Sequence, residues 1–593
     1  MNIPRPQRWD RPFAPDMGEA AVDRLMAIPP FNQMDPERFP DSIPLRGILR
    51  NDSRIRRYYD GDIIIREGDY ENSAYLILSG QVHAVIDAAN PLPAAYLGRR
   101  EPQPKSVFSA LAQWWENPET VERRDLSLYQ GLDVNKRGEG LETRIFLQDV
   151  PAILERHTTA RLFAGQLEQG DVFGELAAMG RIPRTATIFA EGEVELLEID
   201  WQGLRDIRRY DEAFRQHIDT LYRKRGAEEA LRSTWLFTHL AHASAPENCP
   251  CEKCVAMNKI VESTRLETYG SFEWHRSYKQ MVEETAADRL EYEPIIAEEG
   301  DYINGLILIR TGFARLSKRF GHGHRTVNYI GRGHIYGFDE IANNWRSGNQ
   351  APLQHTLRAV GYVDVMVIPT AIIEEYVLGP DRNQPRLPKH FLPPPIKSTA
   401  SDTQVPERAQ SGKANHEDML EFLVEKRFIN GTQTMVIDLD RCTRCDDCVR
   451  ACASTHENNP RFIRHGPKIG HHMVANACMH CADPVCMIGC PTGAIHRDQL
   501  EGQVVINDAT CIGCGMCANS CPYDNIRMVD IRDAHGNFIL DEMTGTSIAK
   551  ATKCDLCVDQ PGGPACQRAC PHDALIRIDL HNDSGSFADW LGR

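Results

Sequence analysis

The strongest constraint on this chain of 593 residues is a cysteine pattern toward its C-terminal end. Sixteen of the nineteen cysteines fall into four consecutive quartets, each beginning Cys-x-x-Cys and ending Cys-x-x-x-Cys. Such a loop can aim three thiolates at one iron-sulfur cube, while the fourth cysteine, starting a short helix, ligates the neighbouring cube. We therefore expect four 4Fe-4S clusters within 436–577. The expected ligands are Cys442, Cys445, Cys448, Cys452; Cys478, Cys481, Cys486, Cys490; Cys511, Cys514, Cys517, Cys521; and Cys554, Cys557, Cys566, Cys570.

Other uses of these cysteines are disfavoured. Structural zinc sites pair Cys-x-x-Cys knuckles across a loop and rarely add a third and fourth cysteine at this spacing. Disulfides are not expected, because no export signal is visible and cytosolic thiols are kept reduced. Pro491, Pro522 and Pro571 follow the last cysteine of three quartets, where a fixed φ helps turn the chain away from the cube.

The segments VIDLDRCTRCDDCVRAC, CMHCADPVCMIGCPTGAI, CIGCGMCANSCPYDNI and KCDLCVDQPGGPACQRACPHDAL resemble the iron-sulfur electron-transfer subunit of molybdopterin oxidoreductases of the dimethyl sulfoxide reductase family and of membrane-bound hydrogenases. The resemblance implies a duplicated ferredoxin-like α+β domain whose outer quartets exchange their last cysteines, as do the inner two. The implied sets are Cys442, Cys445, Cys448, Cys570; Cys554, Cys557, Cys566, Cys452; Cys478, Cys481, Cys486, Cys521; and Cys511, Cys514, Cys517, Cys490. It also implies single-electron transport, with catalysis on a partner subunit of molybdopterin, nickel-iron or flavin type in a hetero-oligomer.

Two earlier stretches, GDIIIREGDYENSAYLILSGQVHAVI from Gly61 and EPIIAEEGDYINGLILIRTGFARLSKRF within 291–320, share a period-2 apolar pattern with an embedded Gly-Asp turn. This pattern predicts an internal repeat of a small antiparallel β-roll. Each repeat continues to a second glycine-rich turn, at Gly170 and Gly333, and then to further strands and a helical segment. The first repeat also carries a polar insertion at about 90–159, which we expect to be a surface excursion.

In the first repeat, FGELAAMGRIPRTATI resembles the phosphate-binding cassette of cyclic nucleotide-binding domains. Gly174, Glu175 and Leu176 open a short helix whose N–H groups can face an anion, and the Glu175 carboxylate suits a ribose hydroxyl. Arg184 offers a fork to two phosphate oxygens, and Thr185 slightly favours cGMP over cAMP within the resembling family. The alternative is a roll that keeps the shape and binds no nucleotide.

The second repeat departs from this pattern. Gly337 and Glu340 match only loosely, and the later strand QHTLRAV places Arg358 several positions away from the expected arginine. We interpret it as a degenerate copy with a structural or docking role. Between the repeats, Cys249, Cys251 and Cys254 could bind zinc with His239 or His242, or could remain reduced structural cysteines.

The predicted fold class is therefore multidomain: two cyclic nucleotide-binding-type β-rolls with flanking helices, a Pro-rich linker, and a duplicated ferredoxin-like 4Fe-4S domain. The linker is rich in Pro, Ser and Lys, so we expect the iron-sulfur module to hang on a tether. The predicted divisions are 1–50, an N-terminal helical extension; 51–222, the first nucleotide-binding domain; 223–285, a helical connector; 286–378, the degenerate second domain; 379–428, the linker; and 429–593, the iron-sulfur domain.

Composition bounds the remaining choices. The net charge of -16 disfavours a nucleic-acid surface, and no apolar run approaches the ~20 residues of a membrane span, so we expect a cytoplasmic protein. We expect an electron-transfer subunit regulated by cAMP or cGMP. The alternatives are a cyclic nucleotide or redox sensor, and an electron-transfer subunit whose rolls only dock it to partners.

Overall fold

The computed structural model describes residues 2–10, 12–86, 122, 124, 163–180, 182–240, 250–270, 293–320, 323–382, 385–387, 392–393, 422–424, 426–498, 502–557 and 563–580. They belong to two compact units. The first unit contains Met1–Tyr222, Gly431–Pro467 and His472–Asp579, and the second contains Arg223–Asn430, Lys468–His471 and Leu580–Arg593. Cys249, most of the linker, and the insertion apart from positions 122 and 124 lie outside the described residues.

The first unit opens with a short strand and two helices. Strand β1 (Asn2–Ile3) precedes helices α1 (Glu19–Met26) and α2 (Leu45–Asn51), with single 3-10 turns at Phe31–Gln33 and Pro36–Arg38 between them. Both helices bury one apolar stripe, and Leu25, Ile48 and Leu49 are completely covered. These elements lie in the segment predicted as an N-terminal helical extension, 1–50, whose last helix ends at Asn51.

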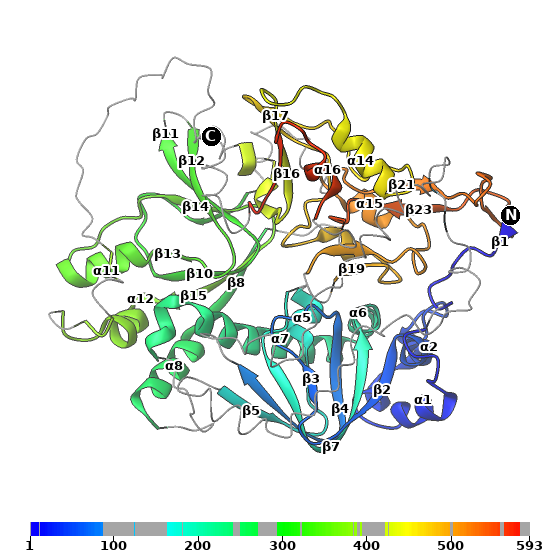
Figure 1. The fold of residues 1–593 in the computed structure, drawn as a ribbon. Helices are drawn as coiled ribbons and strands as arrows, with labels where there is room; N and C mark the ends of the chain where they lie inside the picture. Colours follow the sequence, from blue (N-terminus) through cyan, green and yellow to red (C-terminus); the bar gives the residue numbers. More distant parts are fainter. Residues whose placement is uncertain are drawn as a thin grey trace. The chain divides into compact units, whose positions relative to one another are not determined.

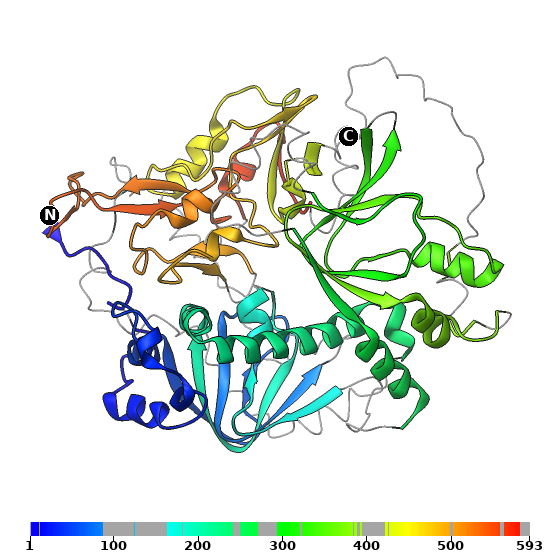
Figure 2. The same ribbon diagram turned by 180° about the vertical axis from the view of Figure 1, so that it is seen from behind.

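A β-roll, called the first roll below, follows these helices in Figures 1 and 2. Its strands are β2 (Ser53–Tyr58), β3 (Ile63–Ile65), β4 (Ser73–Ile86), β5 (Phe163–Leu167), β6 (Val172–Phe173) and β7 (Thr187–Asp200). The antiparallel order is β2-β7-β4-β5, with β3 paired to β7 and β6 paired to β4. The expected strands of the first repeat are therefore confirmed.

From Ala74 to Leu78, strand β4 is buried on both faces. Tyr75 and Ile77 point into the roll, whereas Leu76 and Leu78 pack with the helices on the other face. The β4–β7 pairing shifts register between Ile77 and Ser79 and again between Ser79 and Gln81, and the second shift spans Gly80, whose φ is 87°. A Cβ at this position would lie 2.5 Å from the Glu193 carbonyl oxygen, so only glycine fits the bulge.

Three helices complete the first roll. Helix α5 (Glu175–Gly180) follows β6, and α6 (Trp201–Tyr210) follows β7 directly, with the Asp200 side chain accepting from the Trp201 N–H. Helix α7 (Glu212–Ser233) comes next. The buried face of α6 presents Leu204 and Ile207 to the core that α2 and β4 share.

The second unit contains the strands of the second repeat. These strands form two four-stranded antiparallel sheets, ordered β13-β10-β15-β8 and β12-β11-β14-β9. They are β8 (Arg265–Tyr269), β9 (Ile295–Ala297), β10 (Gly305–Thr311), β11 (Ala314–Phe320), β12 (Gly323–Ile330), β13 (Ile335–Tyr336), β14 (Thr356–Ala359) and β15 (Val363–Pro369). The helical segments are η5 (Trp235–Leu240), α8 (Glu252–Ser263), α11 (Phe338–Ser347), α12 (Thr370–Ile372), η6 (Ile373–Leu378) and η8 (Phe428–Asn430).

The remainder of the first unit, from 431 onward, is called the cysteine module. Its central strand β16 (Thr434–Asp438) pairs antiparallel with β18 (His472–Val474) and β24 (Leu575–Ile578). Two further hairpins pair β19 (Ile495–Arg497) with β20 (Val504–Ile506), and β21 (Arg527–Asp530) with β23 (Ala549–Thr552). The short helices are α14 (Asp447–Thr455), η9 (Val485–Met487), α15 (Met516–Ser520) and α16 (Ala565–Arg568).

The cysteine module shares one compact unit with the first roll, which corrects the expectation that it hangs on a tether. Part of the reason is apolar burial at the N-terminus: β1 pairs in parallel with β22 (Leu540–Asp541), and Ile3 packs with Ile531 and Ile539 of the module.

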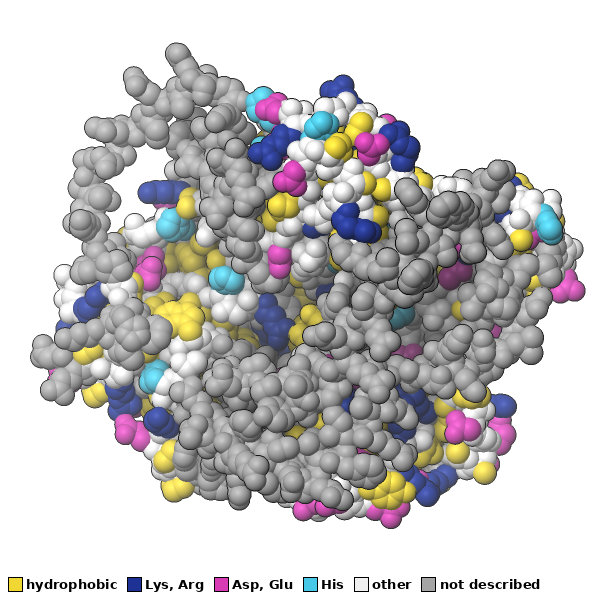
Figure 3. Space-filling view, in the orientation of Figure 1, with side chains coloured by type: hydrophobic (Ala, Val, Ile, Leu, Met, Phe, Trp, Pro, Cys, Tyr) yellow, Lys and Arg dark blue, Asp and Glu magenta, His cyan; other side chains and the backbone are white. Residues whose placement is uncertain are grey.

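No helix among the described residues is long and apolar enough to cross a membrane. On the face in Figure 3, described acidic and basic side chains are interspersed.

Candidate functional site

The four quartets share one backbone feature. The residue immediately before the second cysteine has a left-handed φ in every quartet: 61° at Arg444, 48° at His480, 71° at Gly513 and 61° at Leu556. Three of these residues are not glycine, so the conformation is imposed by the loop rather than by residue type. Successive amides in such a turn form a concavity that suits an anion.

A short helix accompanies each quartet, but it starts earlier than the sequence suggested. Cys448, Cys486, Cys517 and Cys566, the third cysteines, all lie inside α14, η9, α15 and α16. The fourth cysteine is four residues further on: Cys452 lies within α14, whereas Cys490, Cys521 and Cys570 lie one to three residues beyond their helices. In α14, which contains both cysteines, residues four apart lie one above the other, so the thiols of Cys448 and Cys452 lie on the same face of the helix and can serve two neighbouring clusters.

Neighbouring thiols influence one another across the quartets. Burial raises the pKa of Cys452, and the thiols of Cys554, Cys566 and Cys557 raise it further. Cys452 of the first quartet therefore lies among the cysteines of the fourth. Burial also raises the pKa of Cys448 to about 11, with contributions from Cys566, Cys570 and Cys442. The Cys566 thiol raises the pKa of both Cys448 and Cys452, so the thiols of the first and fourth quartets lie next to one another.

The inner quartets behave in the same way. Burial raises the pKa of Cys486 well above its ordinary value, followed by the thiols of Cys521, Cys478 and Cys481. Burial raises the pKa of Cys517 to about 12, with Cys511, Cys490 and Cys514 adding to it. The last cysteine of each inner quartet thus lies with the other quartet's first three.

This donor set fits iron-sulfur clusters. Thiols buried this deeply stay protonated unless a metal takes the place of the proton, and a coordinating metal deprotonates a thiol outright. Some sulfur atoms already accept hydrogen bonds: the Arg461 N–H donates to Cys452 Sγ at 3.2 Å, and the Ala574 N–H to Cys570 Sγ at 3.3 Å. Arg577 also donates to Cys554 Sγ at 3.1 Å. Donors of this kind tune a ligated cluster.

Buried cations around the quartets were not anticipated from the sequence. Lys550 Nζ donates to the carbonyl oxygens of Asp508 and Cys511, and Lys553 Nζ donates to those of Val504 and Cys554. Both lysines are nearly inaccessible, at 0% and 4% exposure. Each buried ammonium group is thus hydrogen-bonded to backbone carbonyls beside the quartets. Nothing in the local sequence marks them, because their environment is created by distant segments.

His456 is a further unanticipated neighbour. Its Nε2 lies 3.6 Å from Cys557 Sγ and 3.3 Å from an Asp555 carboxylate oxygen. These three groups are close enough together to hold a metal ion. Because Cys557 is an expected cluster ligand, we assign His456 and Asp555 to the surroundings of that ligand.

In the first roll, the predicted nucleotide residues Gly174, Glu175 and Leu176 lie at the start of α5, and Arg184 reaches back to the Gly174 carbonyl. Gly174 has a φ of 79°, Glu175 is 1% exposed, and Arg184 is 3% exposed, while Leu176 and Thr185 are half-buried. A Cβ at Gly174 would lie 2.6 Å from Arg184 Nη1, so glycine is required for the arginine to approach.

Arg184 differs from expectation because protein groups hold its terminal nitrogens. Nη1 donates to the Gly174 carbonyl at 2.9 Å, and Nη2 donates to the Ser73 carbonyl at 2.7 Å and the Glu71 carboxylate at 3.0 Å. Among the described residues, its buried Nε–H finds no partner. The two terminal nitrogens of the Arg184 guanidinium therefore bind protein groups in this structure, and only its Nε–H has no described acceptor.

The corresponding residues of the second repeat are used structurally. Gly337 has a φ of 87° and precedes α11, and the Glu340 carboxylate accepts from the Gln354 N–H at 3.3 Å. Arg358 donates to the Glu293 carbonyl at 3.2 Å. In the connector, Cys251 precedes α8 and Cys254 lies within it, both half-buried.

Comparison with known proteins covers both regions. The family model for a 4Fe-4S dicluster domain matches residues 469–579, and the model for a cyclic nucleotide-binding domain matches 155–211. The electron transport protein HydN of Escherichia coli (strain K12) is 35% identical over 157 residues, covering 24% of this chain and 87% of HydN.

Two other relatives are named as components of larger systems. The NADH-dependent phenylglyoxylate dehydrogenase subunit beta of Aromatoleum evansii is 33% identical over 164 residues, covering 26% of this chain and 32% of that protein. Hydrogenase-4 component A of Escherichia coli (strain K12) is 31% identical over 163 residues, covering 23% of this chain and 78% of the component. The predicted resemblances are confirmed: with a cyclic nucleotide-binding domain in its N-terminal part, the chain belongs through its cysteine module to the family of 4Fe-4S electron-transport proteins that includes HydN.

Proposed function

We propose that the cysteine module carries single electrons through four 4Fe-4S clusters arranged as two exchanged pairs. The observation that carries this proposal is the mutual approach of thiols across quartets, above all of Cys452 with Cys554, Cys557 and Cys566. Bound clusters would supply one-electron transfer. The chain's own residues would hold the thiolates and donate N–H groups to sulfur.

The module works, in this proposal, as a subunit of a multisubunit oxidoreductase whose catalytic centre is on a partner. The names of the phenylglyoxylate dehydrogenase subunit and of the hydrogenase component support a subunit role. Clusters whose four protein ligands are all cysteines leave no iron position for substrate, so chemistry is assigned to a partner of molybdopterin, nickel-iron or flavin type.

The first roll is proposed to bind cAMP or cGMP and thereby regulate the electron-transfer function. Gly174, Glu175, Leu176, Arg184 and Thr185 would form the site, with the phosphate at Arg184 and the ribose at Glu175. The buried Arg184 Nε–H without a described protein partner supports an anionic ligand, because a buried donor is normally hydrogen-bonded.

A second candidate role for the first roll is docking. The Arg184 terminal nitrogens already have three protein acceptors, which is also what a purely structural roll would show. In that case the roll would bind no nucleotide and would only support the cysteine module.

Anaerobic purification followed by metal analysis and electron paramagnetic resonance tests the electron-transfer proposal. We expect about sixteen irons per chain, four for each of four clusters, and reduced-state spectra with interacting centres. About four irons, or stoichiometric zinc in the cysteine module, would refute it. Calorimetric titration of the intact protein with cAMP and, separately, cGMP decides between regulation and docking, because only the regulatory role requires binding.

A further inference from the structure

Several cations hold the backbone carbonyls of expected cluster ligands. From within the cysteine module, Lys550 binds the carbonyl of Cys511, Lys553 that of Cys554, Arg577 that of Cys478, and Arg497 that of Cys481. Another comes from the first roll: Arg205 of α6 donates through Nη1 to the carbonyls of Ile488 and Cys490, both at 3.3 Å. The nucleotide-binding domain thus supplies part of the cationic surroundings of an inner ligand.

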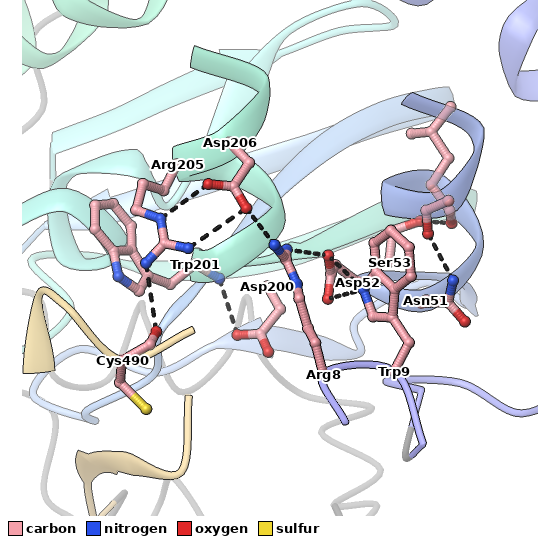
Figure 4. Close-up of polar contacts among 12 residues, drawn as sticks. Arg8, Trp9, Asn51, Asp52, Ser53, Asp200, Trp201, Arg205, Asp206 and Cys490 are labelled. Carbon is pink, nitrogen blue, oxygen red and sulfur yellow. Dashed lines mark hydrogen bonds and ion pairs between the residues drawn. The ribbon is translucent and has the colours of Figure 1, made fainter. Parts of the chain in front are cut away.

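Arg205 is held in place by a chain of charged groups, shown in Figure 4. Its Nε donates to one oxygen of Asp206 at 3.0 Å, and the other oxygen of Asp206 accepts from Arg8 at 2.6 Å. Arg8 also donates to Asp52 at 2.6 Å. Because Arg8 and Asp206 are mostly buried, the position of Arg205 depends on the packing of α6 against the N-terminal segment.

Gln202, one turn earlier on α6, makes a second contact. When its amide nitrogen faces the Asp200 carboxylate, its oxygen accepts from the Gly493 N–H at 3.0 Å. Gly493 follows Cys490 closely and has a φ of 66°. Residues 202 and 205 are three apart, so one face of α6 lies on the segment that carries Cys490.

Tyr70 makes a third contact, close to the nucleotide site. It precedes Glu71, whose carboxylate binds Arg184. The Arg497 guanidinium lies over the Tyr70 ring at 5.2 Å from the centroid, and the same arginine donates to the Cys481 carbonyl at 2.9 Å. A Cβ at Gly502 would lie 2.2 Å from the ring, so the two surfaces are in direct contact.

We propose that Arg205 and Tyr70 couple the first roll to the inner cluster pair, so that a cyclic nucleotide at Arg184 changes the reduction potential of these clusters. Arg205 is a positioning residue: it fixes the Cys490 segment and places a positive charge beside it. Tyr70 connects the Glu71–Arg184 contact to the Arg497 contact at Cys481. This inference rests on the proposed function, because it requires clusters at the inner quartets and a nucleotide at the first roll.

The sign of the Arg205 effect follows from charge. Reduction adds an electron to the cluster, so a nearby cation favours the reduced form, and its removal lowers the potential. We expect Arg205→Ala to reduce the equilibrium constant for reduction of one inner cluster about tenfold, which is about 59 mV for a one-electron couple. Arg205→Lys keeps the charge and should restore most of the potential. Arg208→Ala is the matched control, because Arg208 lies on the same helix but pairs with Asp219.

The measurement is a redox titration of the full chain, followed by electron paramagnetic resonance, with and without saturating cAMP or cGMP. Nucleotide should shift the inner potentials in the parent and in Arg208→Ala, and the shift should be lost in Arg205→Ala and in Tyr70→Ala. Nucleotide should change the equilibrium constant for cluster reduction by a certain factor. By linkage, the nucleotide affinities of the oxidised and reduced protein should differ by that same factor.

The outcomes separate this inference from the proposed function. Loss of iron from the parent protein would refute the electron-transfer proposal itself. Full iron content with equal potentials in Arg205→Ala and Arg208→Ala would overturn the inference alone. A nucleotide-induced shift that persists in both Arg205→Ala and Tyr70→Ala would overturn it too, as would nucleotide binding without any shift in the parent. If iron content is normal but neither nucleotide binds, the proposed regulation and this coupling both fail, while the electron-transfer proposal stands.

Discussion

Arg184 binds three acceptors of its own domain, so an incoming phosphate must compete with the Glu71 carboxylate for the guanidinium. Sequence reasoning identified the arginine but not its competitor, because Glu71 lies 113 positions away. The affinity of the proposed site for a phosphate therefore depends on how readily the Glu71 carboxylate releases the Arg184 guanidinium.

Glu71→Gln should strengthen nucleotide binding. The Glu71 carboxylate would repel a bound phosphate and compete with it for Arg184. Because the Glu71 side chain is 28% exposed, removing its charge should strengthen binding by about 1 kcal/mol, or about fivefold in Kd. Calorimetry with cAMP and cGMP measures this change. Glu168→Gln removes an exposed carboxylate from the same roll and should leave Kd unchanged. Weaker binding in Glu71→Gln would show that the carboxylate supports the site instead.

The buried pair of Arg8 and Asp52 predicts a pH-dependent stability. Burial raises the pKa of Asp52, and the Arg8 charge and the Trp9 N–H offset only part of that effect. Arg8→Ala leaves Asp52 without its cation and leaves Asp206 with Arg205 alone, which should reduce the free energy of unfolding by about 3 kcal/mol at neutral pH.

The deficit of Arg8→Ala should shrink as pH falls. A carboxyl with a higher pKa in the folded than in the unfolded protein binds its proton first in the folded state, so acidification toward about pH 5 stabilises the variant relative to the parent. Denaturant unfolding at several pH values tests this. Arg46→Ala breaks only exposed ion pairs with Glu19 and Asp23 and should show a small deficit with no such trend. A constant deficit would contradict the assignment to Asp52.

Helix α6 illustrates how one element serves two purposes. Leu204 and Ile207 bury its apolar side in the core of the first roll, while Gln202 and Arg205 contact the segment that carries Cys490. Its apolar residues are visible in the sequence. The contact with the cysteine module is not, because it depends on a segment nearly three hundred positions away.

Gly502 offers a test of the contact between Tyr70 and the cysteine module. Gly502→Ala should cost about 1–2 kcal/mol for its left-handed backbone, and about 1–3 kcal/mol more because the new methyl group meets the Tyr70 ring. Gly545→Ala is matched in φ, at 66° against 70°, but has open space around it and should show only the backbone cost.

A double-mutant cycle isolates the ring contact. In a Tyr70→Ala background, the extra cost of Gly502→Ala should disappear, as measured by denaturant unfolding of the anaerobic protein. An extra cost that persists without the ring would contradict the contact.

At the scale of the whole molecule, the first roll and the cysteine module form one compact unit. The Pro-rich composition of 379–428 suggested independent domains, but composition describes only the linker and not the surfaces that it joins. The pairing of β1 with β22 and the contacts of α6 bring the roll and the module together. If the first roll regulates electron transfer as proposed, its effect would pass through these contacts, whereas a tether would favour an effect on partner docking.

Exchanged ligation predicts long-range effects of single cysteines. Cys570→Ala should destroy the cluster expected at Cys442, Cys445 and Cys448, more than a hundred positions away, because it removes that cluster's fourth ligand. Electron paramagnetic resonance and iron analysis should show the loss of about four irons, with the cluster of the fourth quartet retained.

Cys452→Ala should have the reciprocal effect on the fourth quartet's cluster, because Cys452 lies among Cys554, Cys557 and Cys566. Cys254→Ala, outside the quartets, should leave the iron content unchanged. Loss of only the fourth quartet's cluster in Cys570→Ala would refute the exchange.

The sequence by itself determined the elements whose signals are local. Cysteine spacing predicted the 4Fe-4S domain, and period-2 alternation predicted the strands of both repeats; the family models confirm the first and the structure the second. Both signals are short-range, because ligand spacing and strand pleating act within a few residues.

Only the tertiary structure decided which side chains meet across the chain. It placed Glu71 on Arg184, buried Lys550 and Lys553 beside the quartets, and brought Arg205 to the Cys490 carbonyl. Such contacts join residues distant in sequence, and they form where folding removes charged groups from water and leaves them to find partners. Charge pairing at long range leaves no periodic trace in a single sequence, so it is seen only once the chain has folded.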